Sequence, residues 1–184
     1  MRGERVVFVD RDGVVNEDII GGYITRWEDF KFHDTVLTGL KKLTQADYKI
    51  ILISNQAGVG DGVYSEKALR EIHSKMTKVF KKEGIQLHGA YFCLHGKQAS
   101  CECRKPKTGL FEQAAKNGIV FDRKTTYFIG DKVTDIEAGK NFGLRTILVR
   151  TGYGRDAEAE CSDTFRPDAV VDNFEEAADR VLCG

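Results

Sequence analysis

Short apolar runs rich in valine and isoleucine alternate along the chain with longer segments whose apolar residues recur at helical spacing. This alternation is typical of βα units that build a mostly parallel sheet. The sequence therefore predicts an α/β fold. The expected strands are Arg5 to Asp10, Tyr48 to Ser54, Ala90 to Cys93, Thr126 to Gly130, Leu144 to Val149 and Ala169 to Val171.

The clearest helical pattern lies between Ser65, which can cap a helix, and Gly84, which can end one. Its apolar stripe consists of Leu69, Ile72, Met76, Val79 and Phe80. Further helices are expected near Thr35 to Ala46, Gly109 to Asn117, Thr134 to Phe142 and Asn173 to Leu182. The polar stretch Arg155 to Arg166 is predicted to be a loop.

Length and charge narrow the possible functions. The 184 residues suit one domain spanning positions 1–184. Basic and acidic residues balance at 28 each, which argues against nucleic acid or an anionic membrane as a partner. No apolar run approaches the roughly 20 residues of a membrane span, and the first strand begins without a signal-peptide pattern. We therefore expect a cytoplasmic protein, monomeric by default.

Polar residues that could act in catalysis or metal binding follow four of the expected strands. In open α/β sheets, ligands bind beyond the carboxyl ends of the strands, so these residues are expected at one edge. Their convergence is stronger evidence for a functional site than any one motif. The four segments are Asp10-Arg11-Asp12-Gly13, Ser54-Asn55-Gln56, Cys93-Leu94-His95 and Gly130-Asp131-Lys132.

The acidic residues at this edge predict a cation site. Asp10, Asp12 and Asp131 would repel one another unless a cation lay between them, and the oxygens of Asp10 and Asp131 suit a hard ion such as Mg²⁺. Taken singly, Asp-x-Asp-Gly could be an acidic turn and Asp131 a solvated loop acid. Asp135 ranks below them, because a first-turn helix acid also favours the helix dipole.

Three of the five cysteines lie close to a histidine. Cys93-x-His95 and Cys101-x-Cys103 supply three thiolates and one imidazole, which can close a tetrahedral, structural Zn²⁺ site over residues 93–103. Iron is less favoured, and unligated cysteines are the alternative. Arg104 follows directly, so zinc would position it and its neighbour Lys105. The remaining cysteines, Cys161 and Cys183, are expected to be free thiols.

Four segments together resemble the ordered motifs of the haloacid dehalogenase (HAD) superfamily. They are Phe8 to Val14, Ser54 to Gln56, Arg104 to Pro106 and Gly130 to Asp135. The chain is most similar to the subgroup that contains heptose 1,7-bisphosphate and histidinol-phosphate phosphatases. The resemblance implies a Rossmannoid three-layer sandwich without a large cap domain, with a structural zinc-binding loop in the place of the cap.

The resemblance also implies a role for each matched residue. Asp10 would be the nucleophile of a Mg²⁺-dependent phosphomonoester hydrolase that forms an aspartyl-phosphate. Asp12 would be the general acid and base, and its main-chain carbonyl would bind Mg²⁺ together with Asp10 and Asp131. The residues expected to bind substrate or phosphate are Ser54, Asn55, Arg104, Lys105 and Lys132.

The expected substrate is a small phosphorylated metabolite, with a sugar bisphosphate favoured. The segments 16–32 and 149–152 resemble the heptose enzymes more than the histidinol ones, and the basic residues near Lys105 suit two phosphates. Histidinol phosphate is the alternative substrate. An inactive, zinc-stabilised binding module is a further alternative, although such a protein should have lost a reactive residue. His33, His73 and His88 are assigned no chemistry, only surface or capping roles.

Overall fold

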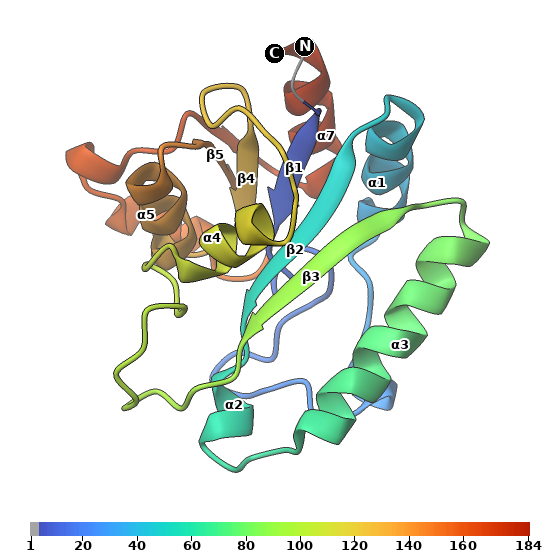
Figure 1. Cartoon of the computed structure of the whole chain (residues 1–184), viewed down its shortest axis with the longest axis vertical. Coiled ribbons are helices and arrows are strands. Elements are labelled where there is room, and N and C mark those ends of the chain that lie inside the picture. Colours follow the sequence, from blue (N-terminus) through green and yellow to red (C-terminus); the bar gives the residue numbers. More distant parts are fainter. Residues whose placement is uncertain (1–3) are drawn as a thin grey trace.

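The computed structural model describes residues 4–184, and its centre is a six-stranded sheet with the order β3-β2-β1-β4-β5-β6 (Figure 1). Every pair of neighbouring strands is parallel. The strands are β1 (Val6–Val9), β2 (Lys49–Asn55), β3 (Leu87–Cys93), β4 (Tyr127–Gly130), β5 (Arg145–Val149) and β6 (Ala169–Val171). The predicted α/β class and parallel sheet are confirmed.

Helices cover both faces of the sheet and complete three layers (Figure 1). The helices are α1 (Val36–Gln45), α2 (Ala57–Gly60), α3 (Glu66–Lys82), α4 (Gly109–Lys116), α5 (Val133–Phe142), α6 (Gly154–Glu160) and α7 (Phe174–Cys183), with 3₁₀ turns at Trp27–Asp29 and Asp163–Phe165. Helices α1, α3 and α7 pack on one face, and α4 and α5 pack on the other.

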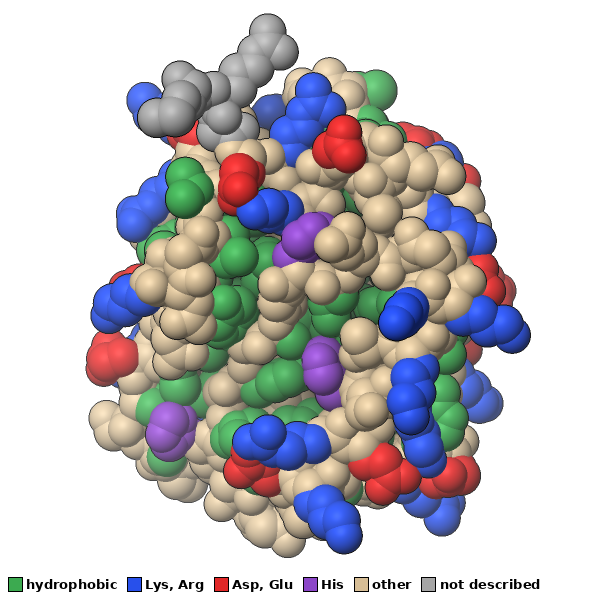
Figure 2. All heavy atoms as spheres, turned by 45° about the vertical axis from the view of Figure 1, so that its right-hand side comes forward, with side chains coloured by type: hydrophobic (Ala, Val, Ile, Leu, Met, Phe, Trp, Pro, Cys, Tyr) green, Lys and Arg blue, Asp and Glu red, His purple; other side chains and the backbone are tan. Residues whose placement is uncertain are grey.

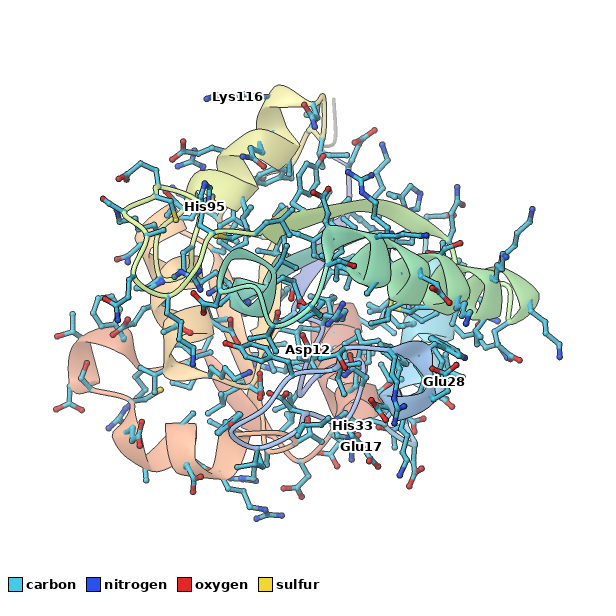
Figure 3. All side chains as sticks on the ribbon, turned by 90° about the horizontal axis from the view of Figure 1, so that it is seen from below. Asp12, Glu17, Glu28, His33, His95 and Lys116 are labelled. Carbon is cyan, nitrogen blue, oxygen red and sulfur yellow. The ribbon has the colours of Figure 1, made fainter. Side chains whose placement is uncertain are left out.

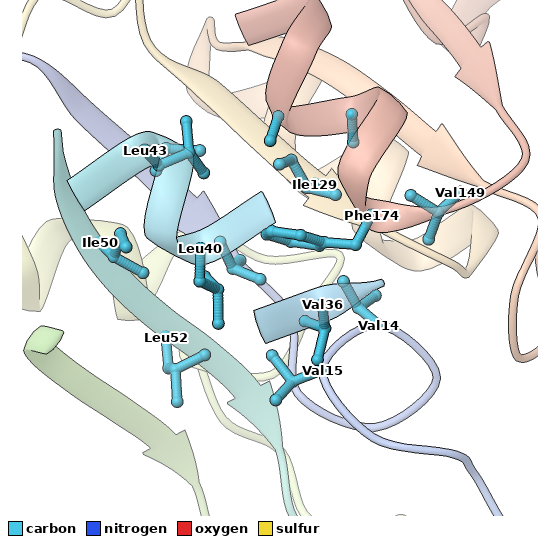
Figure 4. Packing of buried hydrophobic residues seen from close by; sticks show 14 of the residues in the cluster. Val14, Val15, Val36, Leu40, Leu43, Ile50, Leu52, Ile129, Val149 and Phe174 are labelled. Carbon is cyan, nitrogen blue, oxygen red and sulfur yellow. The ribbon is translucent and has the colours of Figure 1, made fainter. Parts of the chain in front are cut away.

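The pleat of the strands explains their continuous apolar sequence. Val7 and Val9 of β1 point into the core under α1, α3 and α7, whereas Val6 and Phe8 point into the core under α4 and α5. A strand that is buried on both faces must be apolar at every position. Figure 4 shows the first of these cores, where Phe174 of α7 meets Leu40 of α1.

Strand β3 forms one edge of the sheet, and α3 covers it incompletely. Figure 2 shows apolar side chains in a hollow on this side of the molecule. Leu69 of α3 and Phe92 of β3 are among the residues that line the hollow. The half-buried state of most of β3 follows from this position at the edge.

The stretch from Arg155 to Arg166 contains a helix, so the prediction of a loop there was wrong. Residues Gly154–Glu160 form α6, and Ala157 packs against Ile136 and Leu148. One buried alanine in a polar seven-residue helix leaves no apolar stripe for sequence analysis to detect.

The order of the strands creates the place for a site. The chain runs from β1 outward to β2 and β3, then returns to the other side of β1 with β4. A crevice forms at such a topological switch point, beyond the carboxyl ends of β1 and β4. Within residues 4–184 no large cap domain interrupts this edge, and no helix is long and apolar enough to cross a membrane.

Candidate active site

A cavity of about 240 Å³ opens at the carboxyl edge of the sheet, where β1, β2 and β4 end. Figure 3 views the molecule from this side, with Asp12 near the centre and His95 in the loop that follows β3. The cavity is lined mainly by charged and polar residues. These are Asp10, Asp12, Asp18, Tyr23, Ser54, Asn55, Lys97, Lys105, Lys132, Thr134, Asp135 and Tyr153, with Gly21, Gly22 and Ala57.

Lys105 is buried between two carboxylates in this cavity. Its Nζ lies 2.8 Å from Asp10 Oδ1 and 2.6 Å from Asp135 Oδ1, and it donates to the carbonyl of Ile53 at 3.1 Å. Burial opposes the charge on Lys105, but Asp10 and Asp135 outweigh it and raise the pKa of the ammonium. Lys105 therefore remains a cation beside the predicted nucleophile.

Asp10 lies at the end of β1, and Asp131, at the end of β4, adds a third carboxylate beside Asp10 and Asp135. With Asp135 they offer three carboxylate oxygens within 4.8 Å of one another, all on buried residues. Burial raises the pKa of Asp10 to about 6, partly offset by Lys105. Burial likewise raises the pKa of Asp131 well above its usual range. The carboxylates thus carry an electrostatic cost that a cation would remove.

The surroundings of Asp131 fit a bound hard cation. Its Oδ2 accepts a hydrogen bond from the backbone N–H of Tyr153 at 2.9 Å, while its buried Oδ1 has no hydrogen-bond partner. A Cβ at Gly13 or Gly152 would lie within 2.2 Å of Asp131 Oδ2. Glycine at these two positions lets backbone approach the carboxylate closely, and oxygen donors are those that Mg²⁺ prefers.

The side chain of Asp12 lines the same cavity but has hydrogen-bond partners outside this cluster. Arg11 donates to both of its oxygens at 2.9 Å, Gln56 donates to Oδ2 at 2.7 Å, and Asn16 donates to Oδ1 at 3.0 Å. Burial alone would raise the pKa of Asp12, but these donors, Arg11 foremost, hold it below its usual value. The ionised carboxylate is therefore fixed at the wall of the cavity.

Ser54, Asn55 and Lys132 also line the cavity, as expected. Asn55 exchanges two hydrogen bonds of 3.1 Å with the backbone of Lys105, so it holds that lysine in place. Lys132 pairs with Asp18 at 2.9 Å.

Arg104 takes a different position from these residues. Its guanidinium donates to the carbonyls of His95 and Gly96, and it is not among the residues that line the cavity. The structure thus brings Lys105, but not the Arg104 side chain, to the carboxylates.

Asp135 is more closely involved than its low rank in the sequence analysis suggested. Its Oδ2 accepts from the backbone N–H groups of Asp131 and Lys132, which is the helix-capping role, while its Oδ1 pairs with Lys105. Several residues that line the cavity carry no signal of a role in the sequence. Among these, Tyr23, Lys97 and Tyr153 come from loops whose path no pattern encodes. Gln56, which does not line the cavity but contacts Asp12 and Ser54, was visible at a strand end.

The three cysteines and the histidine of the 93–103 loop lie together. The Cys103 sulfur is 3.2 Å from both His95 Nδ1 and the Cys93 sulfur, and the Cys93 and Cys101 sulfurs are 3.8 Å apart. These separations exceed a disulfide bond and suit four ligands around one tetrahedral ion. His33, His73 and His88 lie half-buried, apart from the residues that line the cavity.

Comparison with known proteins identifies the family. The family of HAD-hydrolase-like proteins matches residues 102–177. A D-glycero-beta-D-manno-heptose-1,7-bisphosphate 7-phosphatase from Haemophilus ducreyi is 36% identical over 178 residues, which cover 92% of this chain and 96% of that protein. The chain belongs to the HAD-like phosphatases. The HAD resemblance of the four motifs is thereby confirmed.

Two further HAD-like phosphatases are similar to this chain over nearly its whole length. A D-glycero-D-manno-heptose-1,7-bisphosphate 7-phosphatase from Chlorobaculum tepidum is 32% identical over 100% of this chain and 97% of its own. A crystal structure of D,D-heptose 1,7-bisphosphate phosphatase from B. bronchiseptica, complexed with magnesium and phosphate, superimposes with a TM-score of 0.88. It is 28% identical, and the match covers 97% of this chain and 98% of that one.

Proposed function

We propose that this phosphatase removes the 7-phosphate of a heptose 1,7-bisphosphate through an aspartyl-phosphate on Asp10, with Mg²⁺ as cofactor. The observation that carries the proposal is the contact of Asp10 with buried Lys105 at the switch point of the sheet, beside the unpartnered oxygen of Asp131. A carboxylate nucleophile, a fixed cation and a metal-binding oxygen are the parts that phosphoryl transfer needs.

In the first half of the reaction, a carboxylate oxygen of Asp10 forms a bond to phosphorus as the ester P–O bond breaks. The leaving oxygen of the sugar takes the bonding electrons and a proton from Asp12. Lys105 and the hydroxyl of Ser54 hold the phosphoryl oxygens while charge redistributes over them. Because its donors, Arg11 foremost, favour the ionised form, Asp12 must take up a proton before this step, and the same donors then stabilise the carboxylate that remains.

In the second half, water attacks the phosphorus of the aspartyl-phosphate and gives a proton to Asp12. The bond between phosphorus and Asp10 breaks, which restores the Asp10 carboxylate and yields inorganic phosphate. The ionised state of Asp12 suits it to act as this base. Both half-reactions thus use the same two residues.

Asp10, Asp131 and the main-chain carbonyl of Asp12 would hold Mg²⁺. When bound, the ion neutralises carboxylate charge and polarises the phosphoryl group. Asp131 is favoured over Asp135 as a ligand, because both oxygens of Asp135 are engaged by Lys105 and by backbone N–H groups. The cysteine–histidine loop would hold a structural Zn²⁺ that fixes the backbone leading into Lys105.

The relatives support the choice of substrate. Their names specify heptose 1,7-bisphosphate, and the cavity presents Lys97, Lys105 and Lys132 toward an anionic ligand. Histidinol phosphate carries one phosphate and would leave part of this charge unused. We further propose that residues 1–184 act as one catalytic domain in the cytoplasm, where sugar phosphates occur.

The test compares kcat/KM for heptose 1,7-bisphosphate and histidinol phosphate, each with Mg²⁺ and again with EDTA. We expect turnover that requires Mg²⁺ and favours the heptose substrate by at least about 100-fold. A preference for histidinol phosphate would overturn the substrate assignment and leave the phosphatase assignment intact. Full turnover in EDTA would overturn the proposed metal.

A further inference from the structure

A single buried glutamine contacts both Asp12 and Ser54. The amide Nε2 of Gln56 lies 2.7 Å from Asp12 Oδ2 and 2.8 Å from Ser54 Oγ. Its Oε1 lies 2.5 Å from the Tyr64 hydroxyl and 3.1 Å from Arg11 Nη2. Gln56 is 2% exposed, so water does not compete for these contacts. The two polar atoms of the amide therefore serve separate sets of partners.

The chemistry of the neighbours allows only one orientation of the amide. A guanidinium can only donate and a carboxylate can only accept, so a reversed amide would face donor to donor at Arg11 and acceptor to acceptor at Asp12. The Tyr64 hydroxyl supplies a second donor to Oε1, and burial raises the pKa of Tyr64 to about 12, which keeps its proton in place. Arg11 and Tyr64 together thus set the direction of Gln56.

This orientation determines what the Ser54 hydroxyl can do. Both N–H groups of Gln56 are used, one toward Asp12 and one toward Ser54, so Ser54 Oγ accepts. Within residues 4–184, Gln56 is the one side-chain or backbone partner of that oxygen. The hydroxyl proton of Ser54 can then point into the cavity, which Asp10 and Lys105 also line. A phosphoryl oxygen there would accept it.

The same amide fixes the carboxyl group of Asp12. Gln56 contacts Oδ2 and Asn16 contacts Oδ1, while Arg11 bridges the two oxygens. Rotation of the carboxyl plane would break several of these bonds at once, and hydrogen bonds to a charged group are stronger than those between neutral groups. Asp12 is therefore held in one orientation at the wall of the cavity.

We infer that Arg11 and Tyr64, acting through Gln56, are positioning residues that aim the Asp12 carboxyl and the Ser54 hydroxyl at the same phosphate ester. The inference rests on the roles proposed above for Asp12 and Ser54. It adds that a single amide aligns both groups: Asp12, which gives a proton to the leaving group, and Ser54, which donates a hydrogen bond to the phosphoryl group. Disturbing the amide should therefore impair both functions together.

The test uses Gln56→Glu and Tyr64→Phe with two substrates that need Asp12 to different degrees. An aryl phosphate such as p-nitrophenyl phosphate has a leaving group that departs without a proton, whereas an alkyl phosphate requires one. The alkyl substrate is heptose 1,7-bisphosphate, or histidinol phosphate if wild-type protein turns over that ester instead. Because kcat/KM reports the steps through departure of the leaving group, the alkyl-to-aryl ratio of kcat/KM measures alignment of Asp12.

We expect this ratio to fall about tenfold in Gln56→Glu and about threefold in Tyr64→Phe. Tyr48→Phe is the matched control, because its hydroxyl also donates within the fold, to the Val181 carbonyl at 3.2 Å, but away from the cavity. It should keep the wild-type ratio. If these residues had a purely structural role, their substitution would lower kcat/KM equally for both substrates. An unchanged alkyl-to-aryl ratio in Tyr64→Phe therefore overturns the inference, even if Gln56→Glu fails to fold.

A double-mutant cycle tests the link to Ser54. Ser54→Ala should lower kcat/KM for the aryl substrate about 30-fold in the wild-type background but only about threefold in Gln56→Glu, where the hydroxyl turns to donate to the new carboxylate. Equal effects in both backgrounds would contradict the proposed link. Absence of turnover by the wild-type protein on every ester would instead overturn the proposed function, so the two failures are distinguishable.

Discussion

The two candidate metal clusters of this protein are held in place in different ways. Asp10 and Asp131 follow paired strands in the middle of the sheet, and their positions are set by the fold itself. In the cysteine–histidine cluster, Cys93 is buried at the end of β3, whereas the other three residues lie on the following loop, with His95 exposed and Cys101 and Cys103 half-buried. The carboxylates are thus assembled by the fold at an electrostatic cost, whereas the loop residues of the second cluster contact the core only through the partly buried Cys101 and Cys103. A metal should relieve repulsion at the first and supply order at the second.

The largest difference between the two clusters is expected in Asp131→Asn. We expect about a 1,000-fold loss of phosphatase activity, because a ligand of the cation is removed. In the metal-free state the same variant should unfold at a higher temperature than wild type, because one member of a crowded buried cluster becomes neutral. Activity assays with a Mg²⁺ titration and thermal unfolding in EDTA measure the two effects. A lower unfolding temperature in EDTA would contradict the view that this cluster is repulsive.

Lys105→Met should weaken the fold, since the cation between Asp10 and Asp135 is lost. Removing one partner of a buried ion pair typically costs about 3 kcal/mol in the free energy of unfolding. The matched control is Lys107→Met, whose ion pair with Glu102 is exposed to solvent and should contribute less than about 0.5 kcal/mol. Urea denaturation of both variants decides the point, and equal losses would mean that burial of Lys105 is not what matters.

Cys103→Ser should act on the loop cluster in the direction opposite to that of Asp131→Asn on the carboxylates. We expect near-stoichiometric zinc in wild-type protein and little in the variant, with a loss of about 2 kcal/mol in stability and about tenfold in activity. The activity falls because the loop leads directly into Lys105. Cys183→Ser is the control, because Cys183 is exposed and lies outside the cluster. Elemental analysis that finds no zinc in the wild-type protein would refute the zinc proposal.

The smallest effect is expected at Asp168, which lies away from both clusters. Lys140 and two donors of Thr146 outweigh burial and lower the pKa of Asp168 in the folded protein. The stabilisation is therefore present above the unfolded pKa and is lost as pH falls through the lower, folded pKa. Asp168→Asn should cost less than about 1 kcal/mol at pH 7, because solvent screens the half-exposed pair.

Urea denaturation of Asp168→Asn at decreasing pH measures this contribution. The difference from wild type should shrink as the pH passes below about 4, the ordinary range of an aspartate. Asp163→Asn, which removes an exposed partner of Arg166, should change stability little at any pH. A loss at Asp168 that grows on acidification would have the wrong sign and would refute the explanation.

The sequence predicted the sheet well because buried parallel strands leave continuous apolar runs, as in β2. It also brought Asp10, Ser54 and Asp131 to one edge, because strand ends converge by topology, whereas Lys105 follows no strand directly and was expected there from the HAD resemblance. It could not predict that Arg104 would turn toward the backbone of the 95–96 segment, or that Asp12 would be enclosed by Asn16 and Gln56. Those outcomes depend on loop paths and side-chain rotamers, for which the chain carries no periodic signal.

Short helices were missed for a related reason. Helices α2 and α6 are four and seven residues long and bury only two residues each, so helical periodicity is not established. The rank given to Asp135 shows a different limit. A first-turn acid looks the same in sequence whether it only caps a helix or also pairs with a buried lysine, and only the packing of Lys105 against it distinguishes the two.

The proposed role of Asp10 is to carry the phosphoryl group during turnover. It is tested most directly by acid-quenching the reaction of wild-type protein with heptose 1,7-bisphosphate and Mg²⁺ and mapping phosphorylation by mass spectrometry. We predict phosphate on Asp10 in the wild-type protein, and neither phosphorylation nor phosphate release in a folded Asp10→Asn variant. Undiminished Mg²⁺-dependent phosphate release by Asp10→Asn would show that Asp10 is not the nucleophile.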